Sequence, residues 1–299
     1  MRRSLFTITG LVLGLTTVGI HAQQQLQLFA RIVDGKGAPV AALEPGDVTI
    51  KENDVDLKVV KVDPINWPIK VQLLVDNGIG LGNENLSNVR TGVRGLIEAL
   101  PEGTELTLVT TAPQPRIVVR PTTDRAAQLK GVDLLTPDGG VGRFVESLSE
   151  AMQRVEKDKA DFFPVIISAA TVAGDTGSGV ENAYKELIKR LQKRPATVHV
   201  VMFSKSTGQS TGSGGVQTEV GLSVTKMVGG RYEAIAVASR LATLLPEIGA
   251  QVAKSQENQS HQFRITIARN ASGNVGQLSM GTTRSGLSAT SLTMDGRIP

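Results

Sequence analysis

Residues 71–80 have the sequence VQLLVDNGIG, and this stretch decides the fold class. Its first half, 71–75, is a nearly continuous apolar run of the kind found in strands that are buried on both faces. Apolar residues then recur at helical spacing over 86–100, and Pro101 ends the helix. A buried strand followed by an amphipathic helix predicts an α/β fold with a parallel or mostly parallel sheet.

The alternation of strands and helices continues outward from this stretch to about residue 255. It predicts an α/β domain over 67–255, a doubly wound, mainly parallel six-stranded sheet flanked by helices. A surface loop rich in Ser, Gly and Thr is expected at 204–215. The strands are expected at 71–75, 106–109, 117–119, 165–167, 198–203 and 232–235, the second and third as a hairpin, and the helices at 86–100, 144–155, 184–191, 222–227 and 238–253.

The two ends of the chain have an all-β pattern instead. Segments 23–66 and 256–299 each alternate apolar and polar residues in short runs separated by turn signals, and a polar linker at 255–262 precedes the second set of strands. Each segment is too short to bury a core alone, so we expect them to pair as one small β subdomain. Trp67 lies in the stiff connector between two prolines and is expected to cover the join. The strands are expected at 26–33, 48–51, 57–62, 263–267, 276–280 and 287–292.

The first 22 residues have the pattern of a secretory signal peptide. Arg2 and Arg3 precede an apolar run without charge over 5–20, and Ala22 is a small residue just before Gln23. The run is shorter than the ~20 residues that a membrane span needs, so a membrane anchor is the less favoured alternative. No later segment is apolar enough to span a membrane. We therefore expect a secreted or periplasmic protein with no membrane span after cleavage.

Composition excludes several classes of chemistry. The chain has no Cys, which excludes disulfides, thiolate metal sites and cysteine nucleophiles. Its 32 Lys and Arg residues nearly balance 28 Asp and Glu residues, and no basic cluster is interleaved with aromatic residues. Nucleic acid is therefore not expected as a partner.

The motifs of common enzymes are also missing from the sequence. There is no Gly-x-Ser-x-Gly elbow and no phosphate-binding loop, and the glycines from Gly78 to Gly82 do not have the spacing of a dinucleotide-binding turn. His199 lies in an apolar strand and is expected to be a buried sheet residue, whereas His261 is expected to be solvated. A non-enzymatic protein is favoured, and an enzyme of unrecognised type remains an alternative.

Five stretches in order resemble the von Willebrand factor type A (vWA) domain, and in particular the secreted bacterial proteins related to that family. The resemblance covers residues 26–292 and implies a vWA-like α/β fold. The stretches are VDGKGAPVAALEPGDVTIKEND at 33–54, VQLLVDNGIG at 71–80, TPDGGVGRFVESLSEAM at 136–152, FPVIISAATVAGD at 163–175 and TKMVGGRYEAI at 225–235.

Proteins of the vWA family hold Mg²⁺ at the carboxyl ends of the sheet strands, through an Asp, two hydroxyl side chains, a Thr and a second Asp. The resemblance implies that a site of this kind could be present here. Here only the first acid, Asp76, matches. The other four positions hold residues without a side-chain oxygen, and Mg²⁺ needs near-octahedral oxygen coordination. We expect no metal ion and no cofactor. A site shifted onto Thr136, Asp138, Ser168, Thr171 or Asp175 remains an alternative. The four altered positions are Gly78, Gly80, Val141 and Ala169.

With the ligand set reduced to one acid, Asp76 is expected to accept backbone N–H bonds from the loop at 77–82 or to cap the following helix. The residues considered for contact with a partner are Asp76, Asn77, Asp138 and Asp175. The sequence thus favours an exported, non-catalytic protein-binding or scaffold module that works without metal. Metal-dependent adhesion through a shifted Mg²⁺ site and an enzyme of unrecognised type are the alternatives.

Overall fold

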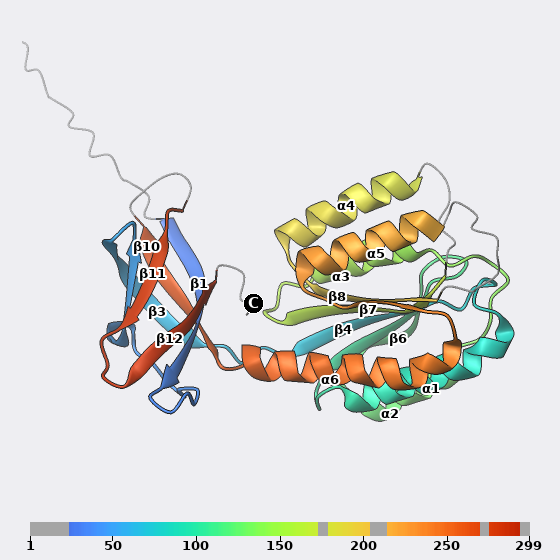
Figure 1. The fold of residues 1–299 in the computed structure, drawn as a ribbon, viewed down its shortest axis with the longest axis horizontal. Helices are drawn as coiled ribbons and strands as arrows, with labels where there is room; N and C mark the ends of the chain where they lie inside the picture. Colours follow the sequence, from blue (N-terminus) through green and yellow to red (C-terminus); the bar gives the residue numbers. More distant parts are fainter. Residues whose placement is uncertain (1–23, 173–178, 204–213, 270–274, 294–299) are drawn as a thin grey trace, which may run out of the picture.

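The computed structural model describes residues 24–172, 179–203, 214–269 and 275–293. These residues form two lobes that lie end to end, an antiparallel β domain and an α/β domain (Figure 1). The chain passes from one lobe to the other twice, after β3 and after α6. The expected signal peptide, most of the expected loop at 204–215, and Asp175 lie outside the described residues.

The α/β domain is built on a six-stranded sheet with the strand order β6-β5-β4-β7-β8-β9. All neighbouring strands are parallel except β5 and β6, which form the expected hairpin and leave one antiparallel strand at the edge. The sheet is therefore mainly but not wholly parallel. Its strands are β4 (Ile69–Val75), β5 (Glu105–Thr110), β6 (Arg116–Thr122), β7 (Phe163–Thr171), β8 (Thr197–Phe203) and β9 (Tyr232–Ile235).

Helices cover both faces of this sheet, with α3, α4 and α5 on one side and α1, α2 and α6 on the other (Figure 1). Strand β4 supplies Leu73 to one hydrophobic cluster and Leu74 to the other, which explains its continuous apolar sequence. None of the described helices is both long enough and apolar enough to cross a bilayer. The helices are α1 (Leu86–Ala99), α2 (Arg125–Asp133), α3 (Phe144–Lys157), α4 (Gly179–Lys193), α5 (Gly214–Val228) and α6 (Leu241–Gln259).

Two helical regions differ from the sequence-based prediction. Helix α2 was not expected, and it starts at Asp124, whose side chain accepts the backbone N–H groups of Ala126 and Ala127. The polar linker expected at 255–262 is wrong over its first half, because α6 continues to Gln259. The single helix expected from residue 238 is also divided, since 238–240 form a 3₁₀ turn before α6 begins.

The β domain combines the two ends of the chain in one antiparallel sheet, in the order β11-β2-β3-β10-β1-β12. Strand β10, from the C-terminal segment, pairs with both β3 and β1 of the N-terminal segment. Buried residues of both segments, among them Leu28, Ile50 and Ile265, form one hydrophobic cluster. The strands are β1 (Gln24–Asp34), β2 (Val48–Glu52), β3 (Val55–Pro64), β10 (Gln262–Arg269), β11 (Leu278–Thr282) and β12 (Leu287–Thr293).

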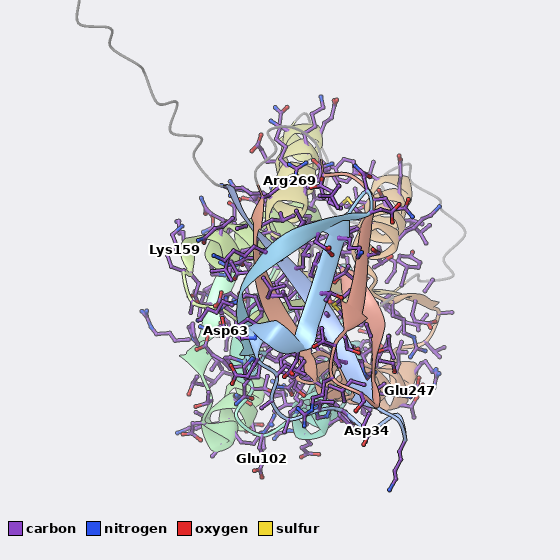
Figure 2. The ribbon with its side chains drawn as sticks, turned by 90° about the vertical axis from the view of Figure 1, so that its left-hand side faces the viewer. Asp34, Asp63, Glu102, Lys159, Glu247 and Arg269 are labelled. Carbon is purple, nitrogen blue, oxygen red and sulfur yellow. The ribbon has the colours of Figure 1, made fainter. Side chains whose placement is uncertain are left out.

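A buried ion pair also joins the two segments, at one end of the β domain. Arg269, labelled at that end in Figure 2, donates from Nε and one Nη to the two oxygens of Glu52, at 2.8 and 2.7 Å. The Gly276 N–H donates to the same carboxylate at 2.7 Å. These bonds, Arg269 first, lower the pKa of Glu52 to about 2. A bidentate pair of this kind holds β2 and the end of β10 together across β3.

Trp67 covers the join between the two domains, as expected. Its ring meets Phe29 of the β domain edge-on, with 5.7 Å between centroids, and lies 5.3 Å from Phe163 of the α/β domain. Arg264 lies over the Trp67 ring and also donates to Asp161 at 2.8 Å. The two domains are therefore joined by aromatic packing and one ion pair in addition to the two chain connections.

Candidate functional site

Parallel strands of the α/β sheet end at one edge, and Asp76 follows β4 at this edge. Its side chain is 3% exposed. Oδ1 accepts the N–H of Gly78 at 2.8 Å, and Oδ2 accepts the N–H of Val172 at 2.9 Å. Burial raises the pKa of Asp76, and these two N–H bonds oppose that rise. Asp76 thus ties its own loop to the loop after β7.

The loop at 136–143 closes the space beside this carboxylate with its own backbone. A Cβ placed on Gly142 would lie 2.5 Å from Oδ2 and 2.7 Å from Oδ1 of Asp76. A Cβ placed on Gly78 would lie 2.7 Å from the Gly140 carbonyl oxygen and 2.9 Å from the Gly142 nitrogen. The backbone of Gly142 therefore lies against both oxygens of Asp76. The backbone of Gly140 and Gly142 leaves no room for a side chain at residue 78.

Asn77 joins three loops at the same edge. Its Nδ2 donates to the Thr136 carbonyl at 2.9 Å, and its Oδ1 accepts the Ala112 N–H at 3.2 Å. The Asn77 carbonyl accepts the N–H of Asp138 at 2.8 Å. Asn77 is only 2% exposed, so its side chain, like that of Asp76, is not available as a surface contact.

The other residues considered from sequence have local roles as well. The half-buried Asp138 accepts the Gly140 N–H at 2.8 Å. Ser168 and Thr171 are buried and hydrogen-bond to each other through their hydroxyl groups. Ala169 is fully buried at the end of β7, and Gly80 is half-buried. In the described part of the chain, no three His, Asp or Glu side chains are grouped in a way that could hold a metal ion.

Two apolar side chains are exposed on the loops that enclose Asp76. Ile79 is 64% exposed and Val141 is 42% exposed. Their loops are joined by a 2.9 Å hydrogen bond from the Ile79 N–H to the carbonyl of Gly140, the residue before Val141. From sequence, Val141 was predicted only as a lost metal ligand, and no role was predicted for Ile79. An isolated apolar residue between Gly78 and Gly80 was the signal available for it.

Ala170, at the end of β7, has a backbone angle φ of +57°, in the left-handed region that disfavours residues with a Cβ. The β7–β8 register is irregular between Ser168 and Thr171. We predict that Ala170→Gly leaves the protein about 1 kcal/mol more stable than Ala169→Gly does, because both changes remove a buried methyl group and only residue 170 is relieved of backbone strain. Urea unfolding measures the change. Ala169→Gly is the matched control and should not stabilise, so equal effects at both positions would contradict this explanation.

His199 is 1% exposed in β8, which confirms that it is a buried sheet residue. Its Nδ1 accepts the Arg231 N–H at 3.2 Å. Burial, together with the nearby charge of Arg231, lowers the pKa of His199 from its ordinary value of 6.5 to about 4. Between these pH values the unfolded chain binds a proton at this residue and the folded chain does not. Stability is therefore complete above pH 6.5 and falls as the pH is lowered towards 4.

This titration gives a testable pH dependence. Over that range His199 should remove about 3 kcal/mol of the free energy of unfolding, at about 1.4 kcal/mol per pKa unit. His199→Asn keeps an acceptor near the Nδ1 position and cannot titrate. Its free energy of unfolding should therefore fall by about 3 kcal/mol less than that of the unaltered chain over the same pH range. Urea unfolding at pH 7 and pH 4 measures the difference. His261→Asn, at an exposed histidine, is the matched variant measured alongside.

Comparisons with known proteins bear on the fold. No protein-family model matches the chain, and no curated protein sequence matches it significantly. Among solved structures it resembles a von Willebrand factor type A protein from Catenulispora acidiphila, with a TM-score of 0.50 and 12% identity over 91% of this chain and 73% of that one. The described chain therefore has the fold of the von Willebrand factor type A class, as the sequence resemblance implied.

Two further solved structures show weaker likeness. The von Willebrand domain of the type V pili tip protein Mfa5 from Porphyromonas gingivalis has a TM-score of 0.47 and 11% identity, over 63% of this chain and 96% of that one. The manganese-loaded TRAP protein of Plasmodium vivax has a TM-score of 0.45 and 16% identity, over 80% of this chain and 98% of that one. Identities this low describe the fold and not the site.

Proposed function

We propose that this chain is an exported, non-catalytic binding module that docks a protein partner through its strand-end loops without a metal ion. The observation that carries the proposal is the exposed apolar pair Ile79 and Val141 on two hydrogen-bonded loops around the buried Asp76. Exposed apolar side chains on adjacent loops, held by a rigid scaffold, are typical of protein-binding surfaces. In this proposal Asp76 and Asn77 hold the loops in place, and their neighbours make the contacts.

The arrangement at Asp76 does not fit the cation that the fold class implies. Mg²⁺ requires six oxygens in near-octahedral geometry and gives up its water reluctantly. Both Asp76 oxygens already accept backbone N–H groups, and Gly142 lies against both of them. The hydroxyls of Ser168 and Thr171 are engaged with each other. Asp76 is the one ligand of that family's set which this chain keeps, and among the described residues no three His, Asp or Glu side chains are grouped to hold a metal ion, which supports docking without metal.

The same geometry supports a role without catalysis. A general acid, base or nucleophile must reach a reacting atom. Asp76 is buried behind backbone, and His199 is the third residue of β8, near the amino end of that strand rather than in a strand-end loop. Among the described residues of the strand-end loops, Asp138 is the remaining acid considered from sequence, and it is engaged with Gly140.

Affinity capture with surface variants tests the docking surface. The mature chain is used as bait on the extracellular or periplasmic fraction of its own organism, with and without a chelator. Ile79→Asp combined with Val141→Asp should abolish capture of the partner found with the unaltered chain. The matched control is Val55→Asp, on a residue that is 66% exposed in the β domain, and it should capture normally. Loss of capture on chelation, or normal capture by the double variant, would contradict the proposal.

The export part of the proposal is supported by the basic start and the apolar run before Gln23. Mass spectrometry of the protein made in a secreting host tests it. The mature chain should begin at Gln23, and retention of residues 1–22 would indicate an anchor instead.

A further inference from the structure

A second candidate site lies at the opposite edge of the α/β sheet, beside the join of the two domains. A cavity of about 310 Å³ opens at the amino ends of β4, β7 and β8, beneath the last turns of α6. Trp67, Phe162 and Phe163 line it together with Val252 of α6. Its volume is at the lower end of the range found for small-molecule sites, and its lining is aromatic and aliphatic with a few polar groups. The cavity therefore has the size and the walls of a site for one small, flat molecule.

One wall of this cavity is formed by a histidine that offers it a hydrogen-bond donor. His199 lines the cavity and is 1% exposed. Because its Nδ1 accepts the Arg231 N–H, the proton of the neutral ring must be on Nε2, which makes that atom a donor. Among the described residues, no acceptor bonds to it. This donor is therefore available to an acceptor atom of a ligand in the cavity.

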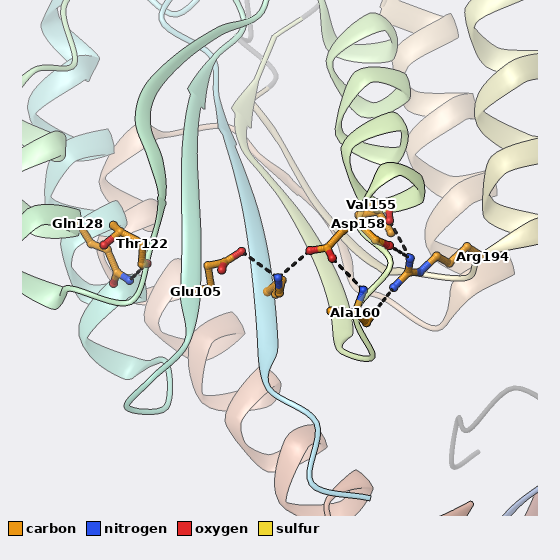
Figure 3. Close-up of polar contacts among 8 residues, drawn as sticks. Glu105, Thr122, Gln128, Val155, Asp158, Ala160 and Arg194 are labelled. Carbon is orange, nitrogen blue, oxygen red and sulfur yellow. Dashed lines mark hydrogen bonds and ion pairs between the residues drawn. The ribbon is translucent and has the colours of Figure 1, made fainter.

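The charge on the cavity lining is positive. The Arg194 guanidinium donates to the carbonyls of Val155, Asp158 and Ala160, as Figure 3 shows, and it lies 4.5 Å from the Phe162 ring centre. All three acceptors are neutral carbonyls, and the carboxylate that feels the Arg194 charge is that of Asp158, whose pKa this charge helps to lower. Lys159, exposed on the same loop, has no carboxylate within salt-bridge distance among the described residues.

The one acid in the lining is already neutralised. Asp161 accepts from Arg264 at 2.8 Å. The lining thus offers one N–H donor and two cations that have no carboxylate within salt-bridge distance among the described residues, beside aromatic rings. Anionic acceptor atoms and an apolar body are the properties that complement such a lining.

We propose that this cavity binds a small aromatic carboxylate, with its ring against Trp67 and Phe163 and its carboxylate accepting from His199 Nε2 in the field of Arg194 and Lys159. The site is separate from the strand-end loops and does not depend on the function proposed for them. Trp67, one of the lining residues, also packs on Phe29 of the β domain.

Trp67 is the single tryptophan of the chain, so its fluorescence reports directly on this cavity. The probe is 3-phenylpropionate, which does not absorb at the excitation wavelength of tryptophan, and the matched neutral probe is 3-phenylpropionamide. Titration of the mature chain with the acid should give a saturable change in Trp67 fluorescence. The amide should bind at least about tenfold more weakly, since it lacks the charge that strengthens these hydrogen bonds. No saturable change, or equal binding of the acid and the amide, would overturn the proposal.

Three variants locate the site. His199→Asn keeps the acceptor for Arg231 and removes the Nε2 donor, so it should weaken binding of the acid about tenfold. Lys159→Met changes an exposed residue and leaves the fold intact, and it should weaken binding about threefold, in line with an exposed charge contact. Lys226→Met, on the exposed surface of α5, is the matched control and should have no effect. Unchanged affinity in both His199→Asn and Lys159→Met would overturn the assignment to this cavity.

Discussion

Deletion of residues 260–299 should unfold residues 24–64 and leave the α/β domain folded. The deletion removes β10, β11 and β12, three of the six strands of the β domain, and β10 lies between β3 and β1. It also removes Phe263, Ile265 and Ile267 from the hydrophobic cluster and Arg269 from its ion pair with Glu52. What remains is too short to bury a core.

The α/β domain should survive this deletion because its two hydrophobic clusters contain residues from 69 to 252 only. Limited proteolysis followed by mass spectrometry measures both outcomes in one experiment. Cleavage should spread through 24–64, while a fragment covering the α/β sheet resists. Protection of 24–64 in the shortened chain would show that the N-terminal strands fold alone, contrary to this account.

Gly142→Ala should be the most damaging single substitution at the strand-end site, at about 4 kcal/mol. Its Cβ would come within 2.7 Å of both oxygens of Asp76, and that carboxylate is fixed by the N–H groups of Gly78 and Val172. Overpacking costs about 1–3 kcal/mol, and each N–H left without an acceptor costs about 1–3 kcal/mol more. Urea unfolding measures the loss.

Gly139→Ala is the matched control for this substitution. Residue 139 is in the same loop, and a Cβ there would meet open space, so the change should stay within about 0.5 kcal/mol. If Gly142→Ala were as stable as Gly139→Ala, the carboxylate of Asp76 would have room beside it. The closed geometry described for the site would then be wrong.

The strands and helices that could be predicted from sequence are those whose buried residues are apolar and recur at regular spacing along the chain. The run at 71–75 is apolar because its side chains enter clusters on both faces of the sheet, and that pattern is visible without a structure. Helix α2 was missed because Gln128 and Gly131 are two of its three buried residues, which hides the apolar stripe. The Asp124 cap was the signal left in the sequence. The end of α6 was missed for a similar reason, because 255–259 has no apolar residue.

Less of the candidate site than of the fold could be predicted from the sequence. The sequence showed that Gly78, Gly80, Val141 and Ala169 provide no side-chain oxygen, since that depends on residue type alone. It could not show that Gly142 lies against Asp76, because that contact joins loops 66 positions apart through the packing of the whole sheet edge. The hydrogen-bond donor on His199 could not be predicted either, since the tautomer of His199 depends on the position of the Arg231 N–H, just before the neighbouring strand β9.

The central claim is that the strand-end site around Asp76 is closed by its own backbone and does not bind a divalent cation. Calorimetric titration of the mature chain with MgCl₂ and MnCl₂ tests this claim most directly, with Asp76→Asn titrated alongside. The account predicts no saturable heat for either ion at millimolar concentrations and no difference between the two proteins. Micromolar affinity for either ion in the unaltered chain, lost in Asp76→Asn, would contradict it.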